Sequence, residues 1–172
     1  DRVVGLIGDP AREGSWDRRG LVVGLVQSGK TAHYVGLINK AVDVGYKVII
    51  VLTGFTESLR VQTQSRIEDG VLGYSKRPHP DKPKDSIKKL CGVELISPLS
   101  SPVDSGTTMR DDFKAANARS FQIHIGGHPI VFVVKKHATV LKHLINWVTE
   151  FGTAIDAEGR GYVQGVPLLV VD

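Results

Sequence analysis

The sequence predicts an α/β fold in which a mostly parallel sheet lies between layers of helices. Residues 47–52, 130–134 and 166–171 are almost wholly apolar, and such runs suit strands that are covered on both faces. Helical patterns lie between these runs, at residues 57–69 and 137–151. Alternation of apolar strands with helices is typical of the α/β class.

A glycine-rich motif near residue 24 predicts a ligand. Residues 24–31 fit G-x-x-x-x-G-K-[ST], between the run Leu21–Val23, which we expect to be a strand, and a helical pattern that ends near Gly45. In this motif backbone N–H groups surround a polyphosphate, the lysine (Lys30) reaches the β- and γ-phosphates, and the hydroxyl (Thr31) binds Mg²⁺. We therefore expect a site for ATP and Mg²⁺, with Lys30 as a catalytic cation; a glycine turn without a ligand is the alternative. The candidate residues are Gly24, Gln27, Ser28, Gly29, Lys30 and Thr31.

Length, charge and cysteine content suit one ordinary domain. The 172 residues divide into a lead-in at 1–19 and a nucleotide-binding lobe at 20–172. The net charge of +4 permits a nucleic-acid partner without requiring one. Cys91 is the single cysteine and no run reaches the ~18 apolar residues of a membrane span, so we expect a cytoplasmic protein with no membrane partner. Because the chain starts at Asp1 and stops directly after an apolar run, we expect a piece of a longer protein.

Two residues ahead of the first expected strand are candidates for holding the nucleotide base. Trp16 offers an aromatic face for stacking, and Arg19 offers a cation that adds to such a stack. The other interpretation is a tryptophan that covers the edge of the core. The sequence does not separate the two.

The segment after the second helix changes in character. The helix at 57–69 should end at Gly70, and residues 70–92 then mix proline with lysine and arginine. We expect a basic surface loop there, either solvated or in contact with nucleic-acid phosphates. The further expected elements are a strand at 93–96, a loop at 97–108, a helix at 109–118 capped by Thr108, and a glycine-rich loop at 152–165.

Metal ligands are suggested at two places. Asp172 follows four apolar residues, and a P-loop enzyme needs an acid at the end of such a strand for Mg²⁺; an ordinary strand-terminal aspartate is the alternative. His124 and His128 are four residues apart, but two glycines between them argue against a helix and no cysteine or acid cluster accompanies them. We therefore expect no zinc site at the histidines.

Several blocks of the chain resemble one known family. They are Trp16-x-x-Arg19-Gly20-Leu21-Val22, Gly24-x-Val26-Gln27-Ser28-Gly29-Lys30-Thr31, Gly36 to Ala41, Gly45 to Leu52, Leu59-Arg60-x-Gln62-Thr63-Gln64, Val133 to Lys136, Leu141-Lys142-x-Leu144, and the terminal Leu-Leu-Val-Val-Asp. Together they resemble the ATPase core of a bacterial superfamily 2 helicase-like group. Members of that group carry a further "Z-one" endonuclease-like domain and occur in restriction and phage-defence systems. The resemblance covers roughly residues 16–172.

The resemblance implies a RecA-like first motor lobe of a P-loop ATPase that works on nucleic acid, with DNA expected. A second motor lobe and the endonuclease-like domain would lie outside this chain, so we expect the chain alone to hydrolyse little ATP. The acidic box of the family usually begins with two aspartates, so either Asp172 or the next residue directs Mg²⁺. The implied contacts to a nucleic-acid backbone are Thr53, Gly54, Arg60, Gln62 and Thr63. For Arg60, Gln62 and Thr63 an exposed helix face is the alternative.

Two classes of function remain open. One is the ATP-driven motor lobe, and the other is a nucleotide-binding switch or scaffold without translocation. Stimulation of ATP turnover by nucleic acid separates them. A P-loop kinase of a small molecule is disfavoured, because lid elements are missing and helicase-like blocks follow residue 50.

Overall fold

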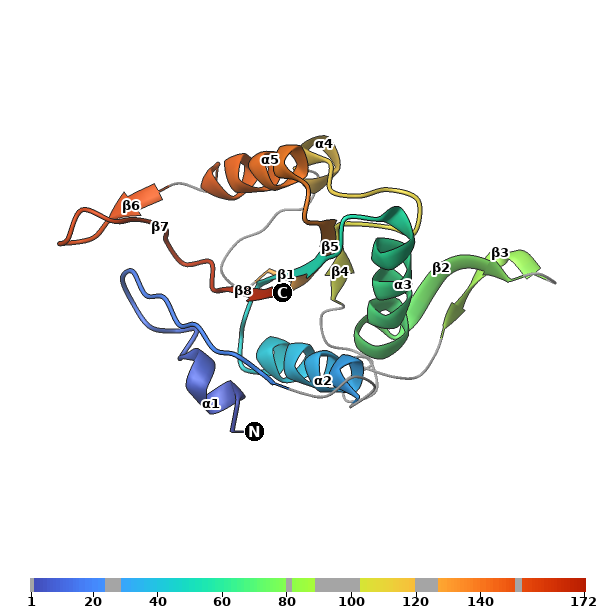
Figure 1. Ribbon diagram of the computed structural model, residues 1–172, viewed down its shortest axis with the longest axis horizontal. Helices are drawn as coiled ribbons and strands as arrows, with labels where there is room; N and C mark the ends of the chain where they lie inside the picture. The colour runs from blue at the N-terminus through green and yellow to red at the C-terminus, as the bar shows by residue number, and fades with distance from the viewer. Residues whose placement is uncertain (1, 24–28, 80–81, 89–102, 120–126, 151–152) are drawn as a thin grey trace.

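The computed structural model describes residues 2–23, 29–79, 82–88, 103–119, 127–150 and 153–172. Its centre is a four-stranded parallel sheet in the order β4-β5-β1-β8 (Figure 1). The strands are β4 (Asp104–Ser105), β5 (Ile130–Lys135), β1 (Val48–Thr53) and β8 (Leu168–Val171). In the register of the sheet, Ile50 of β1 pairs with Phe132 of β5 and with Val170 of β8. The predicted α/β class with a mostly parallel sheet is confirmed.

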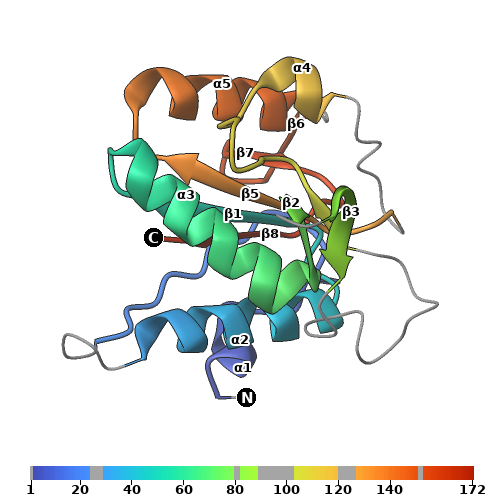
Figure 2. The ribbon, with the colours of Figure 1, turned by 90° about the vertical axis from the view of Figure 1, so that its right-hand side faces the viewer.

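Helices cover both faces of this sheet (Figures 1 and 2). The helices α2 (Lys30–Asp43) and α3 (Glu57–Ile67) lie on one face, while α4 (Ala115–Ala118) and α5 (Ala138–Thr149) lie on the other. Because neighbouring side chains of a strand point to opposite faces, β1 and β5 supply both cores. The core under α2 and α3 includes Ile38, Ala41, Ile49, Val51, Ile67, Val131 and Val133. The core under α5 includes Val48, Ile50, Ile130, Phe132, Val134, Leu144 and Trp147.

An aromatic group organises the core under α5. Phe113, Phe132 and Trp147 pack edge to face, with ring centroids 4.9 to 5.7 Å apart. Gly106, directly after β4, lies against this group, since a Cβ there would overlap the Phe132 ring. This close approach of backbone to ring requires a glycine at position 106.

The end of α3 differs from the prediction. Thr56 caps the helix, with its Oγ1 accepting a hydrogen bond from the N–H of Leu59 at 3.4 Å. The helix then continues as a π-helical turn, η1 (Glu68–Leu72), and ends at Gly73, where φ is 74°. The prediction that Gly70 ends the helix is therefore wrong. Gly70 instead lets η1 approach α2, because a Cβ there would be 2.7 Å from Val35 Cγ1.

The basic segment at 70–92 contains a hairpin rather than a plain loop. Strands β2 (Tyr74–His79) and β3 (Lys82–Lys88) pair in antiparallel fashion. The strand expected at 93–96 lies outside the described residues.

The segment at 152–165 also holds a hairpin, formed by β6 (Thr153–Ile155) and β7 (Gly161–Val163). A turn joins them: Asp156 Oδ1 accepts the N–H of Arg160 at 2.7 Å, and Gly159 has φ 78°.

The predicted helix at 109–118 is shorter in the structure, where it is α4, and the reason is again a local hydrogen bond. Thr108 Oγ1 accepts the N–H groups of Arg110 and Asp111, which closes a turn ahead of the helix.

Leu21–Val23 do not form the expected strand. These residues have no regular structure and are exposed, with Leu21 at 87% and Val23 at 86% of full exposure. An apolar run becomes a strand when a neighbouring strand takes up its backbone hydrogen bonds. In the described sheet, β8 at the edge pairs with β1 alone, so Leu21–Val23 do not pair with it. The lead-in at 1–19 contains a short helix, α1 (Val4–Ile7). Among the described residues, no helix has the length and apolar character needed to cross a membrane.

Candidate functional site

The structure describes the last three residues of the glycine motif, Gly29 to Thr31, at the start of α2. Gly29 precedes the helix with φ 75° and ψ 20°, a left-handed conformation that glycine adopts at little cost. Lys30 and Thr31 form the first turn, and the Gly29 carbonyl accepts the N–H of His33 at 3.1 Å. The N–H groups of a first helical turn point away from the helix and suit an anion. Gly24, Gln27 and Ser28 lie outside the described residues.

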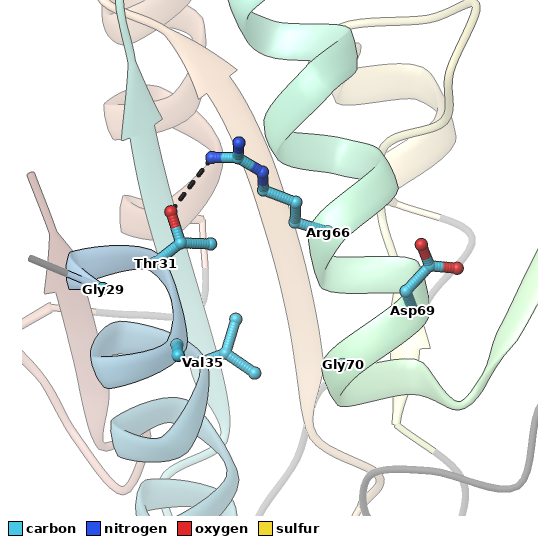
Figure 3. Close-up of a pocket in the computed structure, with 7 residues that line it drawn as sticks. Gly29, Thr31, Val35, Arg66, Asp69 and Gly70 are labelled. Atoms are coloured by element: carbon cyan, nitrogen blue, oxygen red, sulfur yellow. Dashed lines mark hydrogen bonds between the residues drawn. The ribbon is translucent and has the colours of Figure 1, made fainter. Parts of the chain in front are cut away.

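An open pocket of about 460 Å³ lies between the start of α2 and the end of α3 (Figure 3). Arg66 Nη1 donates a hydrogen bond to Thr31 Oγ1 at 3.0 Å, and so joins the two helices beside the pocket. The pocket is shallow and open to solvent. A hydroxyl, a guanidinium and the N-terminal end of a helix together suit a phosphate group. The lining residues are Gly29, Thr31, Ala32, Val35, Arg66, Asp69 and Gly70.

Asp172 lies directly after β8. In Figure 2 this end of the chain and the start of α2 are on the same side of the molecule, beyond the carboxyl ends of the strands. Lys136, which follows β5, donates to Asp172 Oδ1 at 2.6 Å. Both groups are on the surface, so this pair adds little stability. The structure thus places the acid at the carboxyl edge of the sheet, with a lysine as its partner.

Arg60, on α3, lies in the interior. Its side chain has 0% exposure, and its Nη1 and Nη2 atoms donate to the carbonyls of Thr108 at 2.7 Å and Met109 at 3.1 Å. Its Nε donates to Glu57 Oε1 at 2.8 Å. Five donors in a planar fork make arginine suited to such a set of acceptors. The prediction of an exposed helix face is wrong for Arg60, because this guanidinium holds the 108–111 loop against α3, and its burial does not support the predicted phosphate contact.

Glu57 and Lys135 extend this charged group towards the surface. Lys135 Nζ lies 2.7 Å from Glu57 Oε2 and 3.6 Å from Asp112 Oδ2. The hydrogen bond from Arg60 is the main cause that lowers the pKa of Glu57 to about 2; Lys135 acts in the same direction and burial opposes both. The contact with Glu57 in turn raises the pKa of Lys135. The cluster of Glu57, Arg60, Asp112 and Lys135 ties the end of β5 to α3 and to the loop before α4.

The other expected nucleic-acid residues have mixed surroundings. Thr53 is buried at the end of β1, and its hydroxyl donates to the carbonyl of Val134 or of Gly54, at 3.3 and 3.2 Å. Gly54 packs under α3, since a Cβ there would be 2.7 Å from Leu59 Cδ1. On α3, Gln62 is exposed and Thr63 is half-buried. Of the five residues, Gln62 and Thr63 are the two with polar side chains that reach the surface.

Trp16 packs on the core. It covers the edge of the apolar cluster under α2 and contacts Tyr46 edge to face, with centroids 6.2 Å apart. A Cβ on Gly8 would be 3.2 Å from the Trp16 ring, so the lead-in folds closely around it. Arg19 is exposed and pairs with Asp17 at 2.8 Å. This arrangement favours the core-edge interpretation of Trp16.

Sequence reasoning gave Arg66, Glu57 and Lys135 no role. Arg66 is one of several polar residues on the predicted helix, and nothing in its spacing marks the contact with Thr31. Lys135 stands in one of the family-like blocks, directly after a buried strand. Glu57 is an acid in the first turn of α3, the helix that follows the neighbouring strand β1, and this was the signal available for a charge cluster at this edge.

No family model, curated protein or solved structure matches this chain. The resemblance to the superfamily 2 group therefore stays a prediction. Within the described part of the chain, no group of three or more histidine, cysteine or acidic residues is placed to hold a metal. Of the two spaced histidines, His128 is exposed and His124 lies outside the described residues.

Proposed function

We propose that this chain is the ATP-binding, RecA-like first lobe of a nucleic-acid-dependent ATPase. The observation that carries the proposal is the start of α2: a left-handed Gly29, then Lys30 and Thr31, beside an open pocket between α2 and the end of α3. Ligands of open α/β sheets bind at the carboxyl ends of the strands. Membership of a restriction or phage-defence endonuclease is part of the proposal and rests on the family resemblance alone.

The described part of the motif fits a Mg²⁺-bound polyphosphate. Space is open around Gly29 on the side of the described residues, where no atom other than those of its chain neighbours lies within 4 Å of an added Cβ, so backbone can approach a phosphate closely. Lys30 would hold the β- and γ-phosphates, and Thr31 would hold Mg²⁺, with an acid at Asp172 or directly after it. Mg²⁺, when bound, neutralises charge that develops on the γ-phosphate. The role of the chain is to bind and orient the triphosphate.

A nucleotide-binding switch without translocation is the second candidate. Burial of Thr53 and Arg60 favours it, because two of the five residues expected to contact nucleic acid are in the interior. For the motor, the remaining candidate contacts to nucleic acid are Gln62 and Thr63 on α3 and the basic segment that contains the β2–β3 hairpin. Both candidates share the nucleotide site.

Two measurements on the full-length protein separate the possibilities. Equilibrium binding of MgATP tests the nucleotide site, and phosphate release with and without single- or double-stranded DNA tests the motor. We expect micromolar binding, as is ordinary for enzyme substrates, and turnover that rises at least tenfold with DNA. Binding without any DNA stimulation would favour the switch. Failure to bind MgATP would overturn the nucleotide site and both candidates.

A further inference from the structure

The end of α3 presents a cation to the pocket at the start of α2. Arg66 is exposed, and within the described ranges its guanidinium has the neutral Thr31 hydroxyl as its hydrogen-bond partner and forms no ion pair. Figure 3 shows Arg66 pointing towards Thr31 while the carboxylate of Asp69, one turn further on, points away. A positive charge held over an open pocket by a neutral partner attracts anions.

The packing of α2 against η1 fixes this position. Asn39 Nδ2 donates to the carbonyls of Val35 and Gly70, both at 2.9 Å. Gly70 approaches Val35 so closely that a Cβ would be 2.7 Å from Val35 Cγ1. Thr31 lies one helical turn before Val35, and Arg66 lies about one turn before Gly70. The register that joins Val35 to Gly70 therefore also brings Thr31 to Arg66.

We propose that Arg66 is a phosphate-binding residue of the nucleotide site, and that its hydrogen bond to Thr31 holds it there before the nucleotide binds. The inference rests on the proposed function. Oxygens that share one Mg²⁺ at about 2.1 Å lie about 3 Å apart. A phosphate oxygen on the same ion as Thr31 Oγ1 is then within reach of a guanidinium that already contacts Thr31. The planar fork of arginine binds phosphate oxygens in pairs, which a lysine does not do.

The test compares Arg66→Met and Arg66→Lys with a matched control, Arg110→Met. Arg110 is also exposed and lies in the 108–111 loop at the other end of α3, so its loss changes the net charge equally. Binding of MgATP and of AMP, which lacks the β- and γ-phosphates, is measured in the full-length protein. Arg66→Met should weaken MgATP binding about tenfold, the usual value of a hydrogen bond to a charged group. AMP binding should change less than twofold, Arg66→Lys should recover part of the loss, and Arg110→Met should bind as wild type.

A measurement on the wild type covers the case in which a variant fails to fold. Modification of arginines by phenylglyoxal, read by mass spectrometry, should be slowed at Arg66 by MgATP and unchanged at Arg110. Normal or tighter MgATP binding by Arg66→Met, with weakened binding by Lys30→Ala, would overturn the role of Arg66 and leave the proposed function standing. Absence of MgATP binding in the wild type would overturn both.

Discussion

Two arginines six residues apart on α3, Arg60 and Arg66, lie in two regions that differ in burial and in hydrogen bonding. Around Arg60, carbonyl oxygens and Glu57 surround a guanidinium with 0% exposure. Around Arg66, an exposed guanidinium contacts one hydroxyl beside an open pocket. From residue type and helical spacing alone, both arginines would be expected to be cations on the surface. The surroundings of the first tie it into the fold, while those of the second leave it exposed beside the pocket.

The largest effect should come from the pocket side and should fall on activity alone. Lys30→Ala should lower ATP turnover of the full-length protein about a thousandfold, because a preorganised cation at the γ-phosphate contributes several kcal/mol to transition-state stability. The melting temperature should hardly change, since Lys30 is exposed and most surface substitutions cost under ~0.5 kcal/mol. Phosphate release and a melting curve on the same variant check both statements. Normal turnover with a normal melt would identify the motif as a glycine turn without a ligand.

The converse should hold for the buried arginine. Arg60→Met should lower the free energy of unfolding by about 3 kcal/mol, because it leaves buried carbonyls unpaired and removes one cation from Glu57. Arg66→Met is the matched control and should change stability by less than ~0.5 kcal/mol. Urea denaturation of both variants gives the comparison. Equal stabilities would show that the two regions do not differ as described.

The contact that positions Arg66 can be loosened without touching a charge. Gly70→Ala should cost about 1–2 kcal/mol, because the new Cβ meets the stiff side chain of Val35. Gly36→Ala on α2 is the control: apart from the backbone of α2 itself, no atom of the described residues lies within 4 Å of its added Cβ, so the change should be neutral or stabilising. Thermal melts rank the three proteins. If Gly70→Ala and Gly36→Ala have the same melting temperature, then α2 and η1 are not closely packed at this point.

The smallest effect is the pH dependence that Glu57 contributes through its contacts with Arg60 and Lys135. The pKa of Glu57 is lowered to about 2 from its ordinary 4.5, so its contribution is fully present above pH 4.5 and is lost as the pH falls towards 2. Because Glu57 is half-exposed, solvent screening limits this contribution to about 1 kcal/mol. Unfolding measured at pH 6 and pH 3 should show the loss in the wild type and a smaller one in Glu57→Gln. If Glu57→Gln loses as much unfolding free energy between pH 6 and pH 3 as the wild type, the pH dependence comes from other groups.

The sequence was sufficient for the central elements. β1, β5, β8 and α5 are long, apolar or strongly periodic, and the structure has them close to the predicted residues. The hairpins at 70–92 and 152–165 were missed, because their short strands carry no apolar pattern. Leu21–Val23 show the reverse error, since an apolar run indicates a strand but supplies no neighbour for it.

The candidate site was predictable in part. A motif identifies Gly29, Lys30 and Thr31, because its chemistry is local in sequence and the helix follows at once. Arg66 joins that site through packing between helices, and Arg60 leaves the surface because a distant loop, 108–111, supplies carbonyl oxygens. Both outcomes depend on contacts between segments far apart in sequence, which helical periodicity does not report.

The π-helical turn η1 also constrains how this region tolerates changes in length. A π turn holds one more residue than an α-helical turn needs, and η1 leads through Gly73 into the β2–β3 hairpin. A single-residue deletion within 68–72 that spares Gly70 would remove this extra residue, return the turn to α geometry and leave the direction of the following chain nearly unchanged. A deletion in the regular part of α3 would instead rotate everything that follows by about 100°, the angle of one residue on an α-helix. Loss of one residue should therefore be tolerated better in η1 than in α3.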